Sequence, residues 1–108
     1  MKWYKVFDSV DKAKQVVSLN SLQLLLIKNK KICLAHTQAG FFAVDNTCPH
    51  LAASLHKGKV NYLNEIICPW HAYRYNLESG IECSHRSVDL KQYALKIQDN
   101  ALFIGLED

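Results

Sequence analysis

The chain has 108 residues, of which 49% are hydrophobic and 21% are charged, and its formal net charge is +3. This composition is typical of a folded globular protein, and we expect residues 1–108 to form a single domain. The basic residues are scattered without a dense stripe or interleaved aromatic residues, which argues against nucleic-acid binding. No apolar run approaches the roughly 20 residues that cross a bilayer, so we expect no membrane anchor.

The first seven residues bear on the location of the protein and on the state of its cysteines. They alternate polar and apolar side chains, whereas an export signal needs a continuous apolar stretch. We therefore expect a cytoplasmic protein. In that compartment the four cysteines would stay reduced or bind metal instead of forming disulfides.

Short segments with alternating polar and apolar residues follow one another along the chain. This period of two is typical of antiparallel strands with one buried face. The predicted strands are residues 3–7, 23–27, 31–36, 41–45, 65–68, 72–76, 93–98 and 101–106. Residues 9–17 and 51–56 could each hold a turn or two of helix, and Asp99 and Asn100 predict a two-residue hairpin turn. The pattern indicates an all-β fold, a small antiparallel sandwich or barrel of about eight to ten short strands.

Two segments each carry a cysteine and a histidine around a proline. They read Cys48-Pro-His50 and Cys68-Pro-Trp-His71, with 17 residues between them. One such pair alone would more often be a buried cysteine beside a loop histidine. Each pair, however, directly follows a predicted strand, so two neighbouring loops could bring the four side chains together.

Two cysteines and two histidines are compatible with two kinds of metal site. A single tetrahedral zinc ion could take all four side chains. Zinc sites usually draw two cysteines from one knuckle and two histidines from another element, whereas each segment here supplies one of each. This mixed division suits a two-iron cluster, with both thiolates on one iron and both imidazoles on the other.

The two motifs, their spacing and the small all-β chain resemble the Rieske 2Fe-2S family, most closely over residues 41–80. The resemblance implies one 2Fe-2S cluster and a cluster-binding subdomain inserted at residues 46–80. The implied ligands are Cys48 and Cys68 on the inner iron and His50 and His71 on the outer iron.

The resemblance also narrows the class of Rieske protein. Subunits of cytochrome bc complexes carry a disulfide between the two cluster loops and a membrane anchor, but this sequence has Trp70 and Leu51 in the corresponding regions of the loops. Terminal oxygenases carry a second, catalytic domain, for which 108 residues leave no room. We therefore expect a stand-alone ferredoxin, not an enzyme, that passes electrons from a flavin-dependent reductase to a terminal oxygenase as a soluble monomer. The alternatives are a zinc-stabilised binding module and a redox-sensing or iron-sensing regulatory subunit.

Four residues near the motifs are expected to surround the cluster. Leu51 would shield it from water, and Trp70 would either dock a partner or pack over the cluster. Tyr73 and Tyr75 occupy positions where relatives of high potential carry a serine and a tyrosine that donate hydrogen bonds to sulfur. Tyr75 could donate such a bond and raise the potential, or could instead bond water or backbone.

The remaining candidates have simpler interpretations. Residues 84–87 would fill the place where relatives have a proline in a third loop over the cluster. The remaining cysteines are expected to be inert thiols and the remaining histidines to be surface or internally bonded side chains, with His85 nearest the cluster. These residues are Cys33, Cys83, His36, His56 and His85. Lys57, Lys59, Arg74 and Arg86 would either ring the cluster loops or form an ordinary solvated face.

Overall fold

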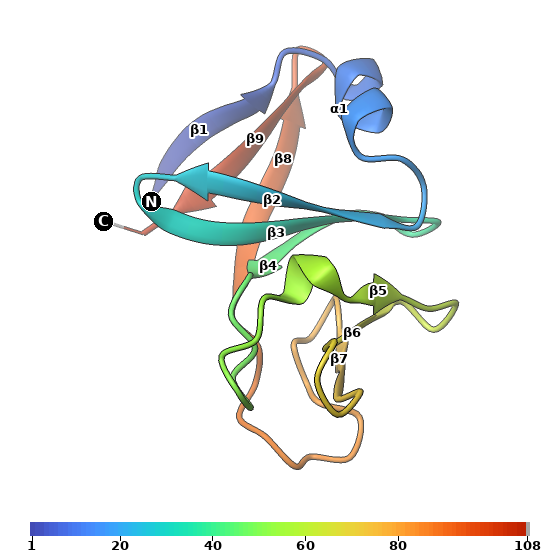
Figure 1. Ribbon diagram of the computed structural model, residues 1–108. Coiled ribbons are helices and arrows are strands. Elements are labelled where there is room, and N and C mark those ends of the chain that lie inside the picture. The colour runs from blue at the N-terminus through green and yellow to red at the C-terminus, as the bar shows by residue number, and fades with distance from the viewer. Residues whose placement is uncertain (108) are drawn as a thin grey trace.

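A six-stranded antiparallel sheet carries both ends of the part of the chain that the computed structural model describes, residues 1–107. Its strands are β1 (Lys2–Phe7), β2 (Ser21–Ile27), β3 (Lys30–Thr37), β4 (Gly40–Asp45), β8 (Gln92–Gln98) and β9 (Ala101–Leu106). They lie in the order β1-β9-β8-β4-β3-β2, and the sheet curls so that its two ends face different directions (Figure 1). The predicted all-β class is confirmed.

Two hairpins of this sheet turn through pairs of left-handed residues. Lys28 and Asn29 have φ values of 50° and 66°, and Asp99 and Asn100 have 51° and 66°. Two-residue turns with positive φ at both positions follow the natural twist of antiparallel strands, and Asn and Asp tolerate that conformation better than most residues. The predicted hairpin turn at Asp99 and Asn100 is therefore confirmed.

A short helix, α1 (Val10–Val16), lies within the predicted segment 9–17. The Ser9 side chain caps it by accepting a hydrogen bond from the Lys12 backbone N–H at 3.0 Å. The helix buries Ala13, which belongs to one of two hydrophobic cores.

A second sheet of three strands is inserted between β4 and β8. It consists of β5 (Lys59–Val60), β6 (Glu65–Ile67) and β7 (Arg74–Asn76), in the order β5-β6-β7. The inserted part begins at the predicted residue but continues past residue 80, because residues 81–91 stay with it. Tyr75 pairs with Glu82 in a β-bridge, and the Leu90 N–H donates to the Gly80 carbonyl oxygen at 2.8 Å. β5 has only two residues, too few for an alternating pattern to appear in the sequence.

Local backbone geometry shifts three predicted boundaries. The predicted strands 65–68 and 72–76 are shorter in the structure, because Cys68 lies in the connecting loop and His71 and Ala72 have left-handed φ values of 62° and 55°. The predicted helix 51–56 is reduced to a single 3-10 turn, η1 (Leu55–Lys57), because Ala52 is also left-handed with φ 56°. A left-handed residue interrupts a strand or a right-handed helix.

β3 holds the two layers together because both of its faces are buried. Ile32 and Leu34 pack into a core with α1 and β9, while Cys33 and Ala35 pack into a second core under the inserted sheet. Successive residues of a strand point to opposite faces, so each core receives every second side chain. The second core includes Cys48 and Cys68, so the two cysteines rest on the six-stranded sheet.

None of the helices in residues 1–107 is long and apolar enough to cross a membrane.

Candidate metal centre

Two loops of matching construction follow β4 and β6 at the end of the molecule farthest from α1 (Figure 1). In each loop the cysteine N–H donates to the carbonyl oxygen five residues later, at 2.9 Å for Cys48 and 2.8 Å for Cys68. The residue four positions after each cysteine, Ala52 or Ala72, is left-handed. Each loop thus closes tightly on itself and holds its cysteine at the base.

Asn46 anchors the start of the first loop. Its buried side-chain Oδ1 accepts hydrogen bonds from the His56 backbone N–H at 2.9 Å and from the His56 ring Nδ1 at 3.1 Å. His56 is therefore a structural histidine whose ring holds the first loop against η1, in agreement with its sequence-based interpretation.

The two cysteines lie side by side in the core. Both are 1% exposed, and burial raises the pKa of the Cys68 thiol to about 11, with a further increase from the adjacent Cys48 thiol. Neutral thiols in such a place are poor nucleophiles, because the thiolate is the reactive form. A bound metal cation would stabilise them as thiolates.

The two histidines also approach one another, nearer the surface. The ring centroids of His50 and His71 are 5.6 Å apart, and His71 is exposed. His50 Nδ1 is buried, and within residues 1–107 it has no hydrogen-bond partner. Buried polar atoms are nearly always satisfied, so this orphaned nitrogen fits a metal ligand.

Tyr73 supports His50 from the second loop. The two rings stack with centroids 3.6 Å apart and an interplanar angle of 9°. The Arg86 guanidinium carbon lies 3.8 Å from the centroid of the same Tyr73 ring. Two groups this close to one ring occupy opposite faces, so Tyr73 is held between an imidazole and a guanidinium.

Tyr75 reaches the cysteines from β7. Its side chain is fully buried, and its hydroxyl oxygen lies 3.5 Å from Cys48 Sγ and 3.1 Å from Ser87 Oγ. The contact with sulfur that the sequence analysis considered for this residue is present, together with a second contact to the loop of residues 84–87.

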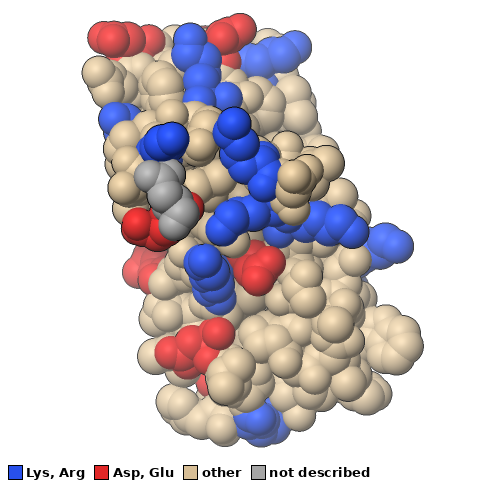
Figure 2. Space-filling view, turned by 90° about the vertical axis from the view of Figure 1, so that its left-hand side faces the viewer, with Lys and Arg blue, Asp and Glu red and all other residues tan. Residues whose placement is uncertain are grey.

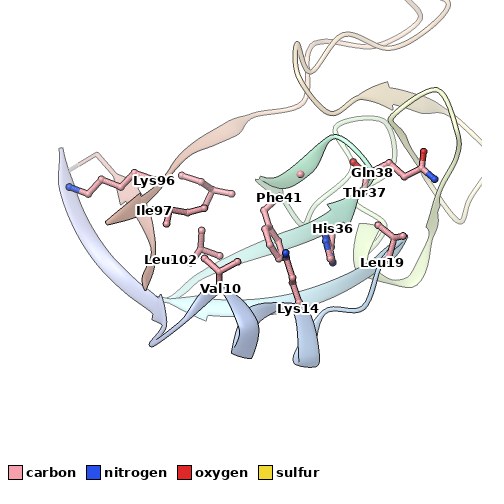
Figure 3. Close-up of a pocket in the computed structure, with 12 residues that line it drawn as sticks. Val10, Lys14, Leu19, His36, Thr37, Gln38, Phe41, Lys96, Ile97 and Leu102 are labelled. Carbon is pink, nitrogen blue, oxygen red and sulfur yellow. The ribbon is translucent and has the colours of Figure 1, made fainter. Parts of the chain in front are cut away.

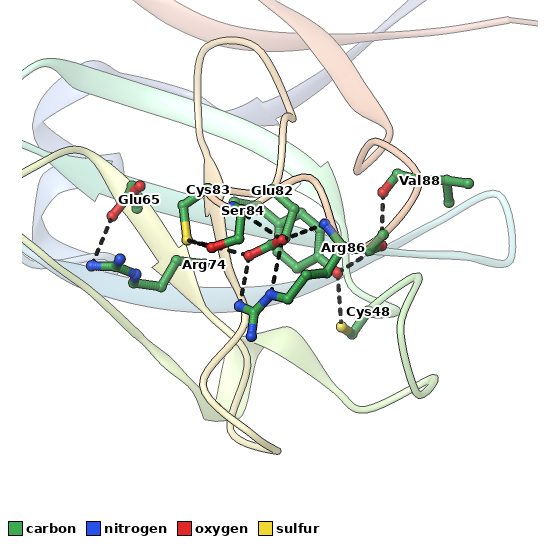
Figure 4. A network of polar contacts seen from close by, with 10 residues as sticks. Cys48, Glu65, Arg74, Glu82, Cys83, Ser84, Arg86 and Val88 are labelled. Atoms are coloured by element: carbon green, nitrogen blue, oxygen red, sulfur yellow. Dashed lines mark hydrogen bonds and ion pairs between the residues drawn. The ribbon is translucent and has the colours of Figure 1, made fainter.

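A buried ion pair fixes that third loop, and the sequence gave no signal for it because Glu82 looks like an ordinary surface acid. Arg86 Nη2 donates to Glu82 Oε2 at 2.8 Å, and the backbone N–H groups of Ser84 and Arg86 donate to Oε1 at 3.1 and 2.8 Å (Figure 4). The Arg86 hydrogen bonds hold the pKa of Glu82 far below its usual range despite complete burial. The third loop, which lacks a proline, is thus stabilised by a carboxylate.

The two apolar residues predicted near the cluster lie at the surface. Leu51 is 45% exposed and Trp70 is 60% exposed. The indole ring of Trp70 contacts the His71 ring edge to face, with centroids 6.4 Å apart. Trp70 thus lies beside an exposed candidate ligand.

Two of the four basic residues predicted near the loops have acidic partners. Arg74 pairs with Glu65 at 3.7 Å and Arg86 with Glu82, while Lys57 and Lys59 are exposed. On the face shown in Figure 2, Lys and Arg gather across the middle of the molecule, and the end that carries the loops is mostly uncharged. This distribution does not form a basic ring on that face.

The remaining histidines and cysteines lie apart from the four candidate ligands. His36 is buried, contacts the Val17 carbonyl oxygen through Nδ1 at 2.7 Å and stacks on Phe41. His85 is exposed. Burial raises the pKa of the Cys33 thiol to about 12, as expected for an inert thiol, whereas Cys83 is exposed and donates to Glu82 at 3.2 Å.

A pocket of about 660 Å³ lies at the other end of the molecule, between α1 and the six-stranded sheet (Figure 3). Val10, Phe41 and Leu102 contribute apolar side chains to it, and none of the four candidate ligands lines it. It is separate from the candidate metal centre.

The candidate ligands therefore form two pairs, buried thiols and more superficial imidazoles. In residues 1–107 no group of three or more His, Cys, Asp or Glu side chains is arranged to hold one metal ion. A Rieske cluster takes two protein ligands at each iron, thiolates at one and imidazoles at the other, and the two pairs fit that donor set.

Comparison with known proteins agrees with this geometry. The Rieske 2Fe-2S domain family matches residues 2–94. The ferredoxin component of an alkene monooxygenase system from Xanthobacter autotrophicus is 28% identical over 102 residues, which cover 94% of this chain and 77% of that protein.

Solved structures share the fold. The ferredoxin of carbazole 1,9a-dioxygenase from Nocardioides aromaticivorans IC177 superposes with a TM-score of 0.83 over 99% of this chain and all of that one, at 16% identity. A ferredoxin-sized chain in a complex of reduced oxygenase and oxidized ferredoxin in carbazole 1,9a-dioxygenase matches with a TM-score of 0.78 and 20% identity, over 94% of this chain and all of that one.

The chain therefore belongs to the Rieske 2Fe-2S domain family, and its cofactor is a 2Fe-2S cluster.

Proposed function

We propose that this protein carries single electrons on a Rieske 2Fe-2S cluster held by Cys48, His50, Cys68 and His71. The observation that supports this ligand set best is the pairwise arrangement, with two adjacent buried thiols below two neighbouring imidazoles, one of which has an orphaned buried nitrogen. When bound, the cluster accepts and releases one electron without other chemistry.

The surrounding residues suit an electron carrier. The core excludes water from Cys48 and Cys68, and the Tyr73 ring fixes the orientation of His50. Exposed His71 offers a short route between the cluster site and a partner that docks on this end. A single domain built in this way binds and releases electrons, and it needs no substrate pocket at the site.

The partners are proposed from the relatives. The alkene monooxygenase ferredoxin and the ferredoxin of the carbazole 1,9a-dioxygenase complex belong to multicomponent oxygenase systems, and the latter is seen with its oxygenase. We infer a terminal oxygenase as acceptor and a flavin-dependent reductase as donor. The monomeric state, the single-domain organisation of residues 1–108 and the cytoplasmic location stay predictions.

The ligand set is tested by serine and alanine substitutions with matched controls. Cys48→Ser and Cys68→Ser should abolish the visible absorption of the cluster and reduce bound iron and acid-labile sulfide from two of each per chain. Cys33→Ser and Cys83→Ser change the same residue type outside the centre and should retain both. Full cluster content in Cys48→Ser or Cys68→Ser would contradict the proposal.

The histidines are tested in the same way. His50→Ala and His71→Ala should lose the cluster, and His85→Ala should keep it. Zinc at one ion per chain, with no iron or sulfide, would instead favour the zinc-stabilised binding module. Regulation of a bound protein without reduction by a flavin reductase would favour the redox-sensing or iron-sensing subunit.

A further inference from the structure

Ser87 lies in the third loop and contacts the tyrosine that faces the cysteines. Tyr75 Oη is 3.1 Å from Ser87 Oγ and 3.5 Å from Cys48 Sγ. Ser87 Oγ in turn donates to the carbonyl oxygen of Val88 at 2.8 Å (Figure 4). These contacts form a continuous polar chain from the loop backbone to the sulfur of Cys48.

The direction of the protons in this chain follows from the backbone end. A carbonyl oxygen only accepts hydrogen bonds, so the contact with Val88 takes the single hydroxyl proton of Ser87. Ser87 Oγ then has lone pairs, and no proton, to offer Tyr75. Tyr75 donates its own single proton to Ser87, and none is left for Cys48.

We propose that Ser87 lowers the reduction potential of the cluster by holding the phenol proton of Tyr75 away from the sulfur of Cys48. This inference rests on the proposed function in one respect, that Cys48 is a cluster ligand. A thiolate ligand is an acceptor, and hydrogen bonds to cluster sulfur are among the factors that set the potential. The reduced cluster has one more negative charge, so a donor at that sulfur stabilises the reduced form more and raises the potential.

The inference changes what is expected of Tyr75. Its position against the sulfur alone would suggest that Tyr75→Phe lowers the potential. With its proton committed to Ser87, removal of the hydroxyl should leave the potential close to that of the unchanged protein. Ser87 is thus a positioning residue, because it acts on the sulfur only through Tyr75.

The decisive measurement is the reduction potential of the loaded protein. In Ser87→Ala the Tyr75 hydroxyl loses its acceptor and should turn to Cys48, which should increase the reduction equilibrium constant about tenfold, or about 59 mV for one electron. The double variant Ser87→Ala with Tyr75→Phe should show no increase. Ser84→Ala removes a hydroxyl from the same loop that contacts Cys83 and not Tyr75, so it should leave the potential unchanged.

Resonance Raman spectra provide a readout independent of the potential. The stretching bands of iron bound to cysteine sulfur should shift between H₂O and D₂O in Ser87→Ala, because an exchangeable proton then lies on that sulfur. The unchanged protein and Tyr75→Phe should lack this additional shift. A loss of packing alone would not create it.

Each outcome bears on a different statement. An unchanged potential in Ser87→Ala with an intact cluster, or a fall in Tyr75→Phe, overturns the role of Ser87. A full cluster in Cys48→Ser overturns the ligand set and the role of Ser87 with it. If Ser87→Ala binds no cluster, Ser87→Gly should show the rise, and Ser87→Thr, which retains the hydroxyl, should keep the original potential; equal potentials in these two variants overturn the role of Ser87.

Discussion

At the scale of single residues, one buried carboxylate organises much of the third loop. Burial alone would favour a neutral Glu82, but the Arg86 side chain and two backbone N–H groups favour the charged form more strongly. The same guanidinium lies over Tyr73, which stacks on His50. The charge of Glu82 therefore fixes, through two contacts, the ring of a candidate ligand.

Replacement of Glu82 by glutamine should destabilise the protein and should do so in a pH-dependent way. Loss of hydrogen bonds to a charged group predicts about 2 kcal/mol at neutral pH, or roughly 10 °C in Tm for a domain of this size. Because the pKa of Glu82 is lowered in the folded protein, its stabilising effect is complete above the unfolded-state pKa and is lost as pH falls toward the folded-state value.

The difference in Tm between the unchanged protein and Glu82→Gln should thus be constant near neutral pH and narrow below about pH 5. Glu78→Gln is the matched control, since Glu78 is an exposed acid in the same segment. Equal Tm values for Glu82→Gln and Glu78→Gln at pH 7 would contradict this account.

At the scale of elements, the two cluster loops depend on close approach between η1 and β6. Gly58 ends the 3-10 turn, and a Cβ at this position would overlap the carbonyl oxygen of Ile67. Ile67 is the residue before Cys68, so the backbone contact at Gly58 also positions the base of the second loop. A glycine is required here for space and not for an unusual φ.

Gly58→Ala should therefore force η1 and β6 apart. Overpacking of this kind typically costs about 1–3 kcal/mol, and because the displaced backbone leads to Cys68, we expect lower cluster content as well. Tm and the ratio of iron to protein are the measurements. Lys57→Ala changes an exposed residue of the same turn and should alter neither; a Gly58→Ala protein with the original Tm would show that the backbones can separate freely.

At the scale of the whole molecule, the exposed end that carries the loops is apolar and not strongly charged. Leu51, Trp70 and Val88 are all exposed, and Trp70 lies beside His71. Aromatic residues in such positions often contribute most to binding at an interface. This end is the surface from which electron transfer through His71 would have the shortest path.

Trp70→Ala should weaken docking of an oxygenase partner without changing the cluster. A loss of about 1–2 kcal/mol corresponds to a rise of roughly tenfold in the ferredoxin concentration needed for half-maximal electron transfer. The reduction potential should not move. Tyr62→Ala removes an aromatic side chain that is 94% exposed in the turn between β5 and β6 and should have no effect on transfer; the same loss in both variants would place docking elsewhere.

Much of the fold was accessible from local pattern. The alternation in β3, β8 and β9 and the residues of the Asp99 and Asn100 turn predicted those elements, because each depends on neighbours in the chain. β5 was missed because two residues carry no period. The helix predicted at 51–56 was reduced because loop closure on Cys48 outweighed the local helical preference.

The sequence by itself determined the donor set, since the identity and spacing of Cys48, His50, Cys68 and His71 are properties of the chain. Only the tertiary structure decided what surrounds that set. The pairing of Glu82 with Arg86 and the contact of Ser87 with Tyr75 join the third loop to the second-loop residues and to β7. Side chains of this kind acquire a function from burial and from partners in space, and no local pattern along the sequence encodes either.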